Sequence, residues 1–354
     1  MLRKFMTLVT IVVAPFIVFS QDPTNTEEKK PTFTVSGSLD AYYRYNFHNA
    51  KDSGRKNNTT SFTNSQNSFE LGMASVRVDA NMGKVGAVVD LGFGTRAAEF
   101  SYNESGPLAA VKQAFLTFSP SGKIKFTMGK WGTHVGYEVL DAYLNRNYSM
   151  DYLFSYGPFS HTGLKVDITL GSVGIMLGVA NPTDYTSASF GKKNAIAQVS
   201  YATKSGKLKS YLNYVGGKDF GDNSVNQVDL VILATITDKF NIGANGSLKS
   251  VKPGGGGSAN SWKGAAVYLN VDPTSVFGLT LRGEYFDDKK GVAGFGTSIF
   301  DATLSANFHI DNLTIIPEFR LDSAKDLLFY KNADTTDPSS KSTGSFILAA
   351  TYHF

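Results

Sequence analysis

The chain has 354 residues and no cysteine, and its 34 Lys and Arg residues nearly balance its 30 Asp and Glu residues. The lack of cysteine excludes disulfides and thiolate metal sites, and so small a net charge gives no reason to expect nucleic acid as a partner. The 26 Phe, 17 Tyr and 35 Gly residues favour β-structure.

Residues 1–20 are typical of a signal peptide for export. Arg3 and Lys4 precede an apolar run, and small residues lead up to the expected cleavage after Ser20. The polar, proline-bounded segment 21–31 then indicates a short flexible lead. No later apolar run reaches about 18 residues, so the sequence predicts no membrane-spanning helix.

After this lead, apolar and polar residues alternate almost everywhere, which is typical of β-strands with one buried face. Near the C-terminus, Phe300, Ala302 and Leu304 alternate with Asp301 and Thr303. The pattern predicts sixteen strands, near 33–47, 67–82, 85–94, 109–119, 123–130, 162–171, 173–180, 194–202, 207–216, 226–237, 240–249, 261–271, 277–286, 298–309, 312–322 and 344–354.

The links between these strands alternate between short and long. Tight turns rich in Gly, Pro, Asp and Ser follow the even-numbered strands, and long polar loops follow the odd-numbered ones. The long links include 48–66, 95–108, 131–161, 181–193, 250–260 and 323–343. Residues 32–354 are therefore predicted to form an all-β, transmembrane up-and-down antiparallel barrel, with short periplasmic turns and long extracellular loops. A hairpin hidden in a loop would change the count by about two strands.

The last predicted strand ends on an aromatic residue. Tyr352 and Phe354 share its apolar face, an ending that resembles the signal read by outer-membrane assembly machinery. We therefore expect this machinery to be a partner through Phe354. Pro317 departs from the strand pattern, because a closed barrel has no free edge for a residue without an N–H. We expect a bulge there, or a strand that starts later.

The same alternation places a set of charged residues on the inner face of the barrel. Water in a barrel of this size can solvate such charges, whereas a dry core could not. Their mixed signs argue against strong selection for anions or for cations. The predicted pore-lining residues are Asp40, Arg44, Arg77, Asp79, Asp90, Lys125, Lys165, Asp167, Asp229, Arg282, Glu284, Asp301, Glu318 and Arg320.

The third long link, 131–161, concentrates polar groups. We expect a short helix that starts near Thr133, with its apolar side on the barrel wall and a polar stripe facing water. Residues at i, i+4, i+7 and i+11 would form that stripe. The predicted constriction residues are His134, Glu138, Asp141, Asn145, Arg146 and His161.

Two chemical alternatives exist for the same segment. His134, Glu138 and His161 could together bind a metal, although no HExxH-type motif is present. Ser149 or Ser160 could instead pair with one of these histidines as a nucleophile and its base. The interpretation as a constriction is favoured, so we expect no metal, no cofactor and no enzymatic activity.

Two blocks of sequence resemble a known family. They read FTVSGSLDAYYRYNF at 33–47 and GKWGTHVGYEVLDAYLNRNYSMDYLFSYGPFSHTGLK at 129–165. Both are similar to the OmpL-like β-barrel porin family of Gram-negative bacteria, particularly Bacteroidota. The resemblance implies a channel for small solutes in the cell outer membrane, and it supplies no catalytic residues.

We therefore expect a water-filled barrel, surrounded by lipid, through which small hydrophilic solutes diffuse passively. Trimeric general porins fold their third extracellular loop inward, and by analogy residues 131–161 would narrow this pore. A homo-oligomer would also fit this architecture. Two other functions stay open: an outer-membrane enzyme of phospholipase or protease type with a site at the barrel rim, and a structural or adhesive barrel.

Overall fold

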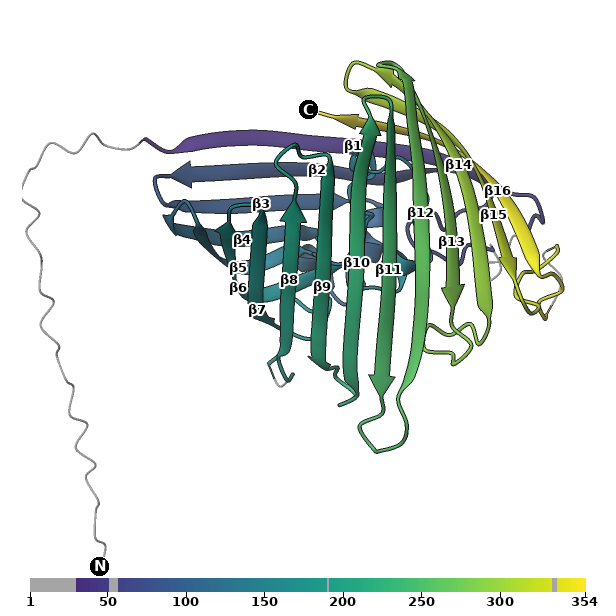
Figure 1. Cartoon of the computed structure of the whole chain (residues 1–354). Helices are drawn as coiled ribbons and strands as arrows, with labels where there is room; N and C mark the ends of the chain where they lie inside the picture. Colours follow the sequence, from purple (N-terminus) through teal and green to yellow (C-terminus); the bar gives the residue numbers. More distant parts are fainter. Residues whose placement is uncertain (1–29, 51–56, 190, 333–335) are drawn as a thin grey trace, which may run out of the picture. The chain divides into compact units, whose positions relative to one another are not determined.

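The strands of the computed structural model close into a sixteen-stranded antiparallel barrel (Figure 1). The structure describes residues 30–50, 57–189, 191–332 and 336–354, so the predicted signal peptide and nearly all of the predicted lead lie outside the described residues. Each strand pairs with its neighbours in sequence, and the first strand pairs with the last to close the ring. The predicted fold class and strand count are confirmed.

The strands are β1 (Thr32–Asn46), β2 (Ser68–Met82), β3 (Val85–Phe93), β4 (Val111–Ser121), β5 (Ile124–Gly132), β6 (Ser160–Leu170), β7 (Val173–Ala180), β8 (Asn194–Ala202), β9 (Leu208–Lys218), β10 (Ser224–Thr237), β11 (Phe240–Lys252), β12 (Asn260–Thr274), β13 (Phe277–Asp287), β14 (Ser298–Ile310), β15 (Leu313–Ala324) and β16 (Ser342–His353). Short helical segments lie in the long loops: α1 (Thr95–Phe100), η2 (Gly106–Ala110), η3 (Ala142–Leu144) and α2 (Tyr152–Ser155). Within the described residues, no helix has the length and apolar content needed to cross a membrane.

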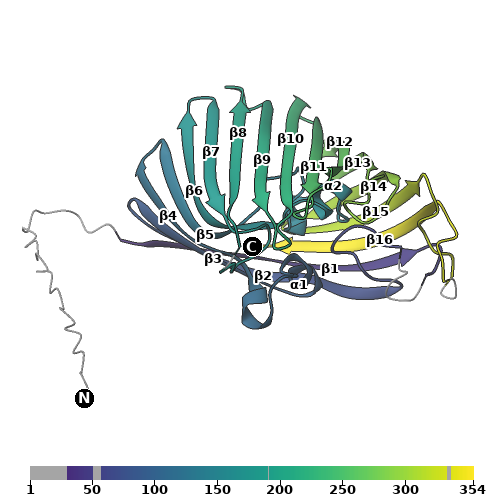
Figure 2. The same ribbon diagram turned by 90° about the horizontal axis from the view of Figure 1, so that it is seen from below.

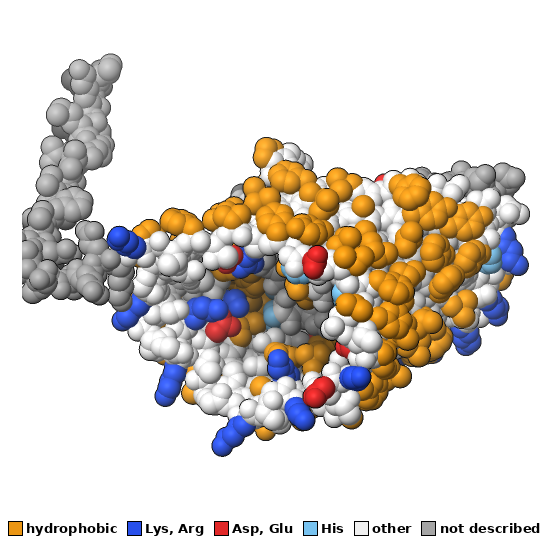
Figure 3. Space-filling model, turned by 90° about the horizontal axis from the view of Figure 1, so that it is seen from above, with side chains coloured by type: hydrophobic (Ala, Val, Ile, Leu, Met, Phe, Trp, Pro, Cys, Tyr) orange, Lys and Arg blue, Asp and Glu red, His pale blue; other side chains and the backbone are white. Residues whose placement is uncertain are grey.

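Strand β14 shows how the alternating sequence produces the wall. Phe300, Leu304 and Phe308 are exposed on the outside, whereas Asp301 and Thr303 are fully buried inside. Figure 3 shows hydrophobic side chains spread over the outer surface of the wall. Lipid offers no hydrogen bonds to a backbone, so every strand in such a wall needs a partner on both edges, and a closed ring supplies them.

Short turns and long loops are segregated to opposite ends, as predicted. Two-residue links join β2 to β3 and β6 to β7, and Gly83 and Gly171 have φ values of 60° and 63° there. Tight hairpin turns need this left-handed conformation, which glycine adopts without a Cβ clash. Because the strands are antiparallel, the links after odd-numbered strands emerge at the other end, the side from which Figure 2 is seen.

The end of the chain closes the barrel beside its start. Gly37 and Phe354 exchange two backbone hydrogen bonds of 3.0 Å, and Leu39 lies opposite Tyr352 in the β1–β16 pair. The aromatic chain end therefore belongs to the seam of the barrel.

Pro317 lies within the continuous strand β15, so the predicted bulge and the predicted late start are both wrong. On the β16 side it lies opposite Leu348. On the β14 side the regular pairing is interrupted opposite Pro317 and Ile316, and the register is the same before and after this gap. The missing N–H is therefore accommodated by a local break in one ladder, without a shift of the strand.

The lipid-facing surface leads to a test of how the barrel sits in a bilayer. Leu304 lies at the centre of β14 and Ile310 at its end, both on the outer face. We expect Leu304→Arg to lower the free energy of unfolding in lipid vesicles by about 2–4 kcal/mol, and the control Ile310→Arg by about 0–1 kcal/mol, because the cost of a charge falls toward the interface. Denaturant titration measures both values, and equal losses would contradict this placement.

Candidate functional site

The link between β5 and β6, residues 133–159, folds into the barrel and packs against one side of the lumen, and we call it the third loop (Figure 2). It is mostly irregular chain with many bends, and it has two short helical turns, η3 and α2. The prediction of a helix that starts near Thr133 is wrong. Gly136 has a φ of 97°, which no right-handed helix allows, and hydrogen bonds to the wall hold the neighbouring backbone.

The predicted polar stripe is therefore absent. His134, Glu138 and Asp141 contact three different strands of the wall, β9, β13 and β4 respectively. Asn145 folds back onto its own loop and donates to the carbonyl oxygen of Val139 at 2.6 Å. Each of these residues thus has its own partner and no helical stripe joins them, although His134, Glu138 and Asp141 all line the same cavity.

Glu138 lies in a buried ion cluster between the third loop and the wall. Its carboxylate pairs with Arg282 of β13 at 2.7 Å and accepts the N–H of Asp151 at 2.8 Å. Arg282 also pairs with Asp301 of β14 at 2.9 Å and donates to the carbonyl of Ser149 at 2.7 Å. Water is excluded from these groups, so removal of one partner would leave an uncompensated charge.

Two wall carboxylates each accept two consecutive backbone N–H groups of the third loop. Glu284 of β13 accepts those of Tyr152 and Leu153, the first residues of α2, at 2.8 and 2.9 Å. Glu318 of β15 accepts those of residues 148–149 at 2.7 and 3.1 Å. Hydrogen bonds to a charged group contribute about 1.5–3 kcal/mol each, so these contacts fix the loop firmly.

Asp184, in the loop after β7, does the same at the end of the third loop. It accepts the N–H groups of Phe159 and Ser160, both at 2.7 Å, and the hydroxyl of Tyr102 at 3.0 Å. Three carboxylates therefore each hold two consecutive N–H groups of the backbone: Glu284 and Glu318 use both carboxylate oxygens, and Asp184 uses only Oδ1. The carboxylate clamps, as we call them, are Glu284, Glu318 and Asp184.

Arg146 binds the third loop to the wall near the short-turn end of the barrel. Its guanidinium pairs with Asp272 near the short-turn end of β12 at 2.5 Å, and it donates to the hydroxyl of Thr280 at 2.8 Å. The loop thus reaches from the long-loop end of the barrel, the outer end, to a point near the short-turn end, the inner end.

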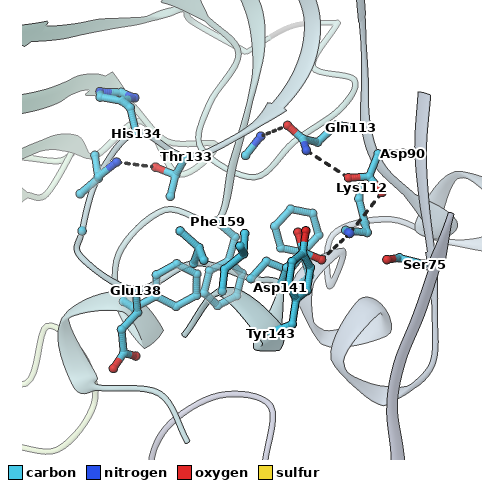
Figure 4. Close-up of a pocket in the computed structure, with 18 of the residues that line it drawn as sticks. Ser75, Asp90, Lys112, Gln113, Thr133, His134, Glu138, Asp141, Tyr143 and Phe159 are labelled. Atoms are coloured by element: carbon cyan, nitrogen blue, oxygen red, sulfur yellow. Dashed lines mark hydrogen bonds and ion pairs between the residues drawn. The ribbon is translucent and has the colours of Figure 1, made fainter. Parts of the chain in front are cut away.

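On its other side the third loop faces the open part of the lumen. Asp141 pairs with Lys112 of β4 at 2.6 Å, and Lys112 also pairs with Asp90 of β3 at 3.2 Å (Figure 4). Gln113 donates to the same Asp90 at 3.1 Å. These groups form a charged strip across the lumen, with two acids around one lysine.

The two histidines lie side by side, with ring centroids 5.0 Å apart. Nε2 of His134 lies 3.3 Å from the carbonyl oxygen of Tyr214, and Nε2 of His161 lies 3.1 Å from the hydroxyl of Thr133. Both rings are thus held by neutral groups of the loop and the wall.

The residues of the two chemical alternatives have other partners. Glu138 pairs with Arg282, and the Ser149 hydroxyl lies 3.4 Å from the same guanidinium. The backbone N–H of Ser160 is bound by Asp184. Across the described part of the chain, no group of three or more His, Cys, Asp or Glu residues is placed to hold a metal ion.

The predicted lumen charges fall into two sets. One set is buried under the loops, where protein rather than water surrounds the charge: Asp40, Arg44, Asp229, Arg282, Glu284, Asp301, Glu318 and Arg320. Asp90 is also buried, but it lies on the open side of the lumen beside Lys112. The other set keeps access to water on β2, β5 and β6: Arg77, Asp79, Lys125, Lys165 and Asp167. The expectation that water solvates all of them is wrong for the first set, because the loops cover that part of the wall.

The uncovered side of the lumen contains a cavity of about 560 Å³, lined by the third loop and by residues of β1–β5, β8 and β9 (Figure 4). A second cavity of about 410 Å³ lies among the outer loops. Phe159 lines both cavities. It belongs to a buried apolar cluster from the first three long loops, made of Phe62, Phe100, Met150, Phe154 and Phe159.

Sequence reasoning missed three residues of this site. Lys112 and Tyr268 occupy inward positions of β4 and β12, so strand alternation could have identified them. Tyr268 donates to Asp151 at 2.7 Å and thereby joins the ion cluster. Asp184 lies in a loop, where no periodic pattern marks a residue.

Comparison with known families matches residues 32–354 to the family described as "Putative beta-barrel porin-2, OmpL-like". Comparison with curated proteins gives no match. The match covers the whole barrel, so it confirms the resemblance that the two sequence blocks indicated.

Solved structures with the same fold are outer-membrane proteins. The channel DcaP of Acinetobacter baumannii is 12% identical, with a TM-score of 0.64, over 92% of this chain and 97% of that one. An anion-selective porin from Comamonas acidovorans is 11% identical, with a TM-score of 0.62, over 92% and 100%. OmpT of Vibrio cholerae is 13% identical, with a TM-score of 0.60, over 92% and 98%. At these identities the likeness establishes the barrel fold, and the family match adds the rest: the chain belongs to the OmpL-like β-barrel porin family and is an outer-membrane porin.

Proposed function

We propose that this porin lets small hydrophilic solutes diffuse across the outer membrane through the side of the lumen that the third loop leaves open. The observation that carries the proposal is the pair of cavities, of about 560 and 410 Å³, that share Phe159 as a lining residue. A solute would enter the outer cavity, pass Phe159 and leave at the short-turn end. The path needs no cofactor and no catalytic step.

In this proposal the third loop sets the width of the path. Some of its residues face the solute, and others hold the loop in place. Asp141 faces the passing solute together with Lys112. Glu138, Asn145 and Arg146 act indirectly, because their bonds hold the loop in place. The carboxylate clamps prevent the loop from moving into the open side.

His134 contributes no charge to the path at neutral pH. Burial lowers the pKa of its imidazole to about 4, and hydrogen bonds to backbone carbonyls offset only part of this effect. The ring is therefore neutral between pH 6 and pH 8, and we propose that it positions the start of the loop.

Three partners belong to the same proposal. Lipid would surround the apolar outer face, and assembly machinery would read the chain end at Phe354 after removal of the signal peptide, residues 1–20. A homo-oligomer is supported by OmpT of Vibrio cholerae, whose structure is described in a trimer form and is 13% identical to this chain.

Planar-bilayer recording tests the channel and its narrowest point. We expect the wild-type protein to give discrete conductance steps, and Phe159→Ala to raise the step size roughly twofold, because the aromatic ring between the two cavities is removed. Phe300→Ala, on the lipid-facing side of β14, is the control and should leave the step size unchanged. Well-folded protein without steps would contradict the open channel, and an unchanged step in Phe159→Ala would contradict the path.

The clamps predict a change in current noise. Glu284→Gln replaces one acceptor oxygen by an NH₂ group that faces a backbone N–H, so the start of α2 loses about 1.5–3 kcal/mol of hydrogen bonding. We expect the open-channel current to fluctuate between levels as the loop detaches. Glu70→Gln, a partly exposed carboxylate on β2, is the control. Steady current in both variants would show that the loop does not depend on this clamp.

The lowered pKa of His134 predicts acid sensitivity. Below its unfolded pKa of about 6.5, unfolding takes up a proton that the folded ring does not carry, so this residue's contribution is complete above pH 6.5 and is lost as the pH falls toward 4. We expect the wild type to lose about 2 kcal/mol of unfolding free energy between pH 8 and pH 5 relative to His134→Gln. Denaturant titrations at both pH values measure this, with the exposed His353→Gln as control. A parallel pH dependence of wild type and His134→Gln would contradict it.

A further inference from the structure

Lysines gather at the short-turn end of the barrel. The seven short turns carry five lysines and two aspartates, all in the described part of the chain. Two further exposed lysines lie at the adjoining ends of β5 and β9. Figure 3 shows a hollow with Lys and Arg side chains around its edge. We call this set the inner lysines: Lys84, Lys123, Lys125, Lys204, Lys207, Lys209 and Lys239.

Two inner lysines stand at lumen-facing positions. Lys125 precedes the lipid-facing Phe126, and Lys209 follows the lipid-facing Leu208, so strand alternation directs both inward. Lys209 forms no ion pair with any described residue, and it lies two positions from Tyr211, which lines the 560 Å³ cavity. At least one positive charge at the inner end of the path is therefore uncompensated.

The other accessible charges of the open side are mostly paired, and the strip of Asp90, Lys112 and Asp141 keeps one net negative charge farther along the path. Arg77 pairs with Asp79 at 2.7 Å, and Lys165 pairs at 3.2 Å with Asp167, which also lies opposite Lys125 across the β5–β6 pair. The described residues of the long outer loops carry eleven acidic and nine basic groups. A net positive potential is thus confined to the inner end of the channel.

The position of the inner lysines favours a solute over a lipid headgroup as the anion that they meet. They lie on the turns and strand ends between β2 and β11, an arc that contains six of the strands lining the open cavity, β2–β5, β8 and β9. Outside this arc the turns from β12 to β13 and from β14 to β15 carry no lysine, and the second of them carries Asp311; inside the arc only the turn from β6 to β7 lacks one. Headgroups surround a barrel on all sides, so lysines that serve only lipid would not be restricted to one arc.

We propose that the inner lysines make this porin prefer small anions, such as carboxylates and phosphates, over cations of similar size. The inference rests on the proposed diffusion channel and names the charge class of its solutes. A positively charged channel entrance next to a low-dielectric wall raises the local concentration of anions and repels cations. Salt screens this effect.

The test is the reversal potential of purified protein in a phosphatidylcholine bilayer under a KCl gradient. We expect chloride to permeate at least about threefold better than potassium near 0.1 M salt, and the ratio to fall toward one near 1 M, where the screening length shortens to about 3 Å. The double variant Lys125→Gln with Lys209→Gln should bring the ratio toward one at low salt. Lys289→Gln with Lys290→Gln, in an outer loop, is the matched control and should leave it unchanged.

The possible outcomes distinguish a failure of the anion preference from a failure of the proposed channel. Conductance with a ratio of one or below, or a ratio that the inner double variant does not lower, would overturn the anion preference and leave the channel standing. An absence of conductance would overturn the proposed function instead. A preference that disappears when phosphatidylglycerol is added to the bilayer would show that headgroups bind the lysines, and it would assign the lysines to lipid and overturn the inference.

Discussion

The carboxylate clamps are the interaction on which the position of the third loop depends. A loop that enters a barrel must find acceptors for every N–H that it turns away from water, and a strand wall has already used its own carbonyls. Glu284 and Glu318 solve this by accepting two donors each. Arginines complete the arrangement, because Arg282 and Arg320 lie beside these acids and donate to loop carbonyls at 2.7 and 2.6 Å.

This docking divides the lumen into unequal halves. The walls from β10 to β16 and part of β1 are covered, so their charged side chains belong to a polar core with fixed partners. The walls from β1 to β9 keep a cavity with water access along part of their length. In the proposed channel, the width of the pore therefore depends on where the loop is bound as much as on the number of strands. A sixteen-stranded barrel alone would leave a far wider channel.

Strand alternation and turn chemistry were enough to predict the barrel, because both arise from local residue choice. Each link after an even-numbered strand contains residues that favour a tight turn. In each strand, every second residue is apolar and faces lipid. The third loop could not be predicted in the same way. His134, Glu138 and Asp141 have the spacing of a helical stripe, but contacts with distant strands and the positive φ of Gly136 override it. The alternation correctly predicted that Asp301 and Glu318 face inward. It could not predict whether water or the third loop would contact them.

The reach of the third loop also has a mechanical consequence. The loop is bonded to β4 through Asp141, to β10 through Gly136, and to β12 through Arg146, so it spans the interior between distant parts of the wall. A hollow ring of strands can flatten by small shears spread over many pairs, whereas a ring with an internal strut must stretch these bonds first. The contacts that in the proposed channel fix the aperture would therefore also make the barrel resist lateral pressure from the membrane.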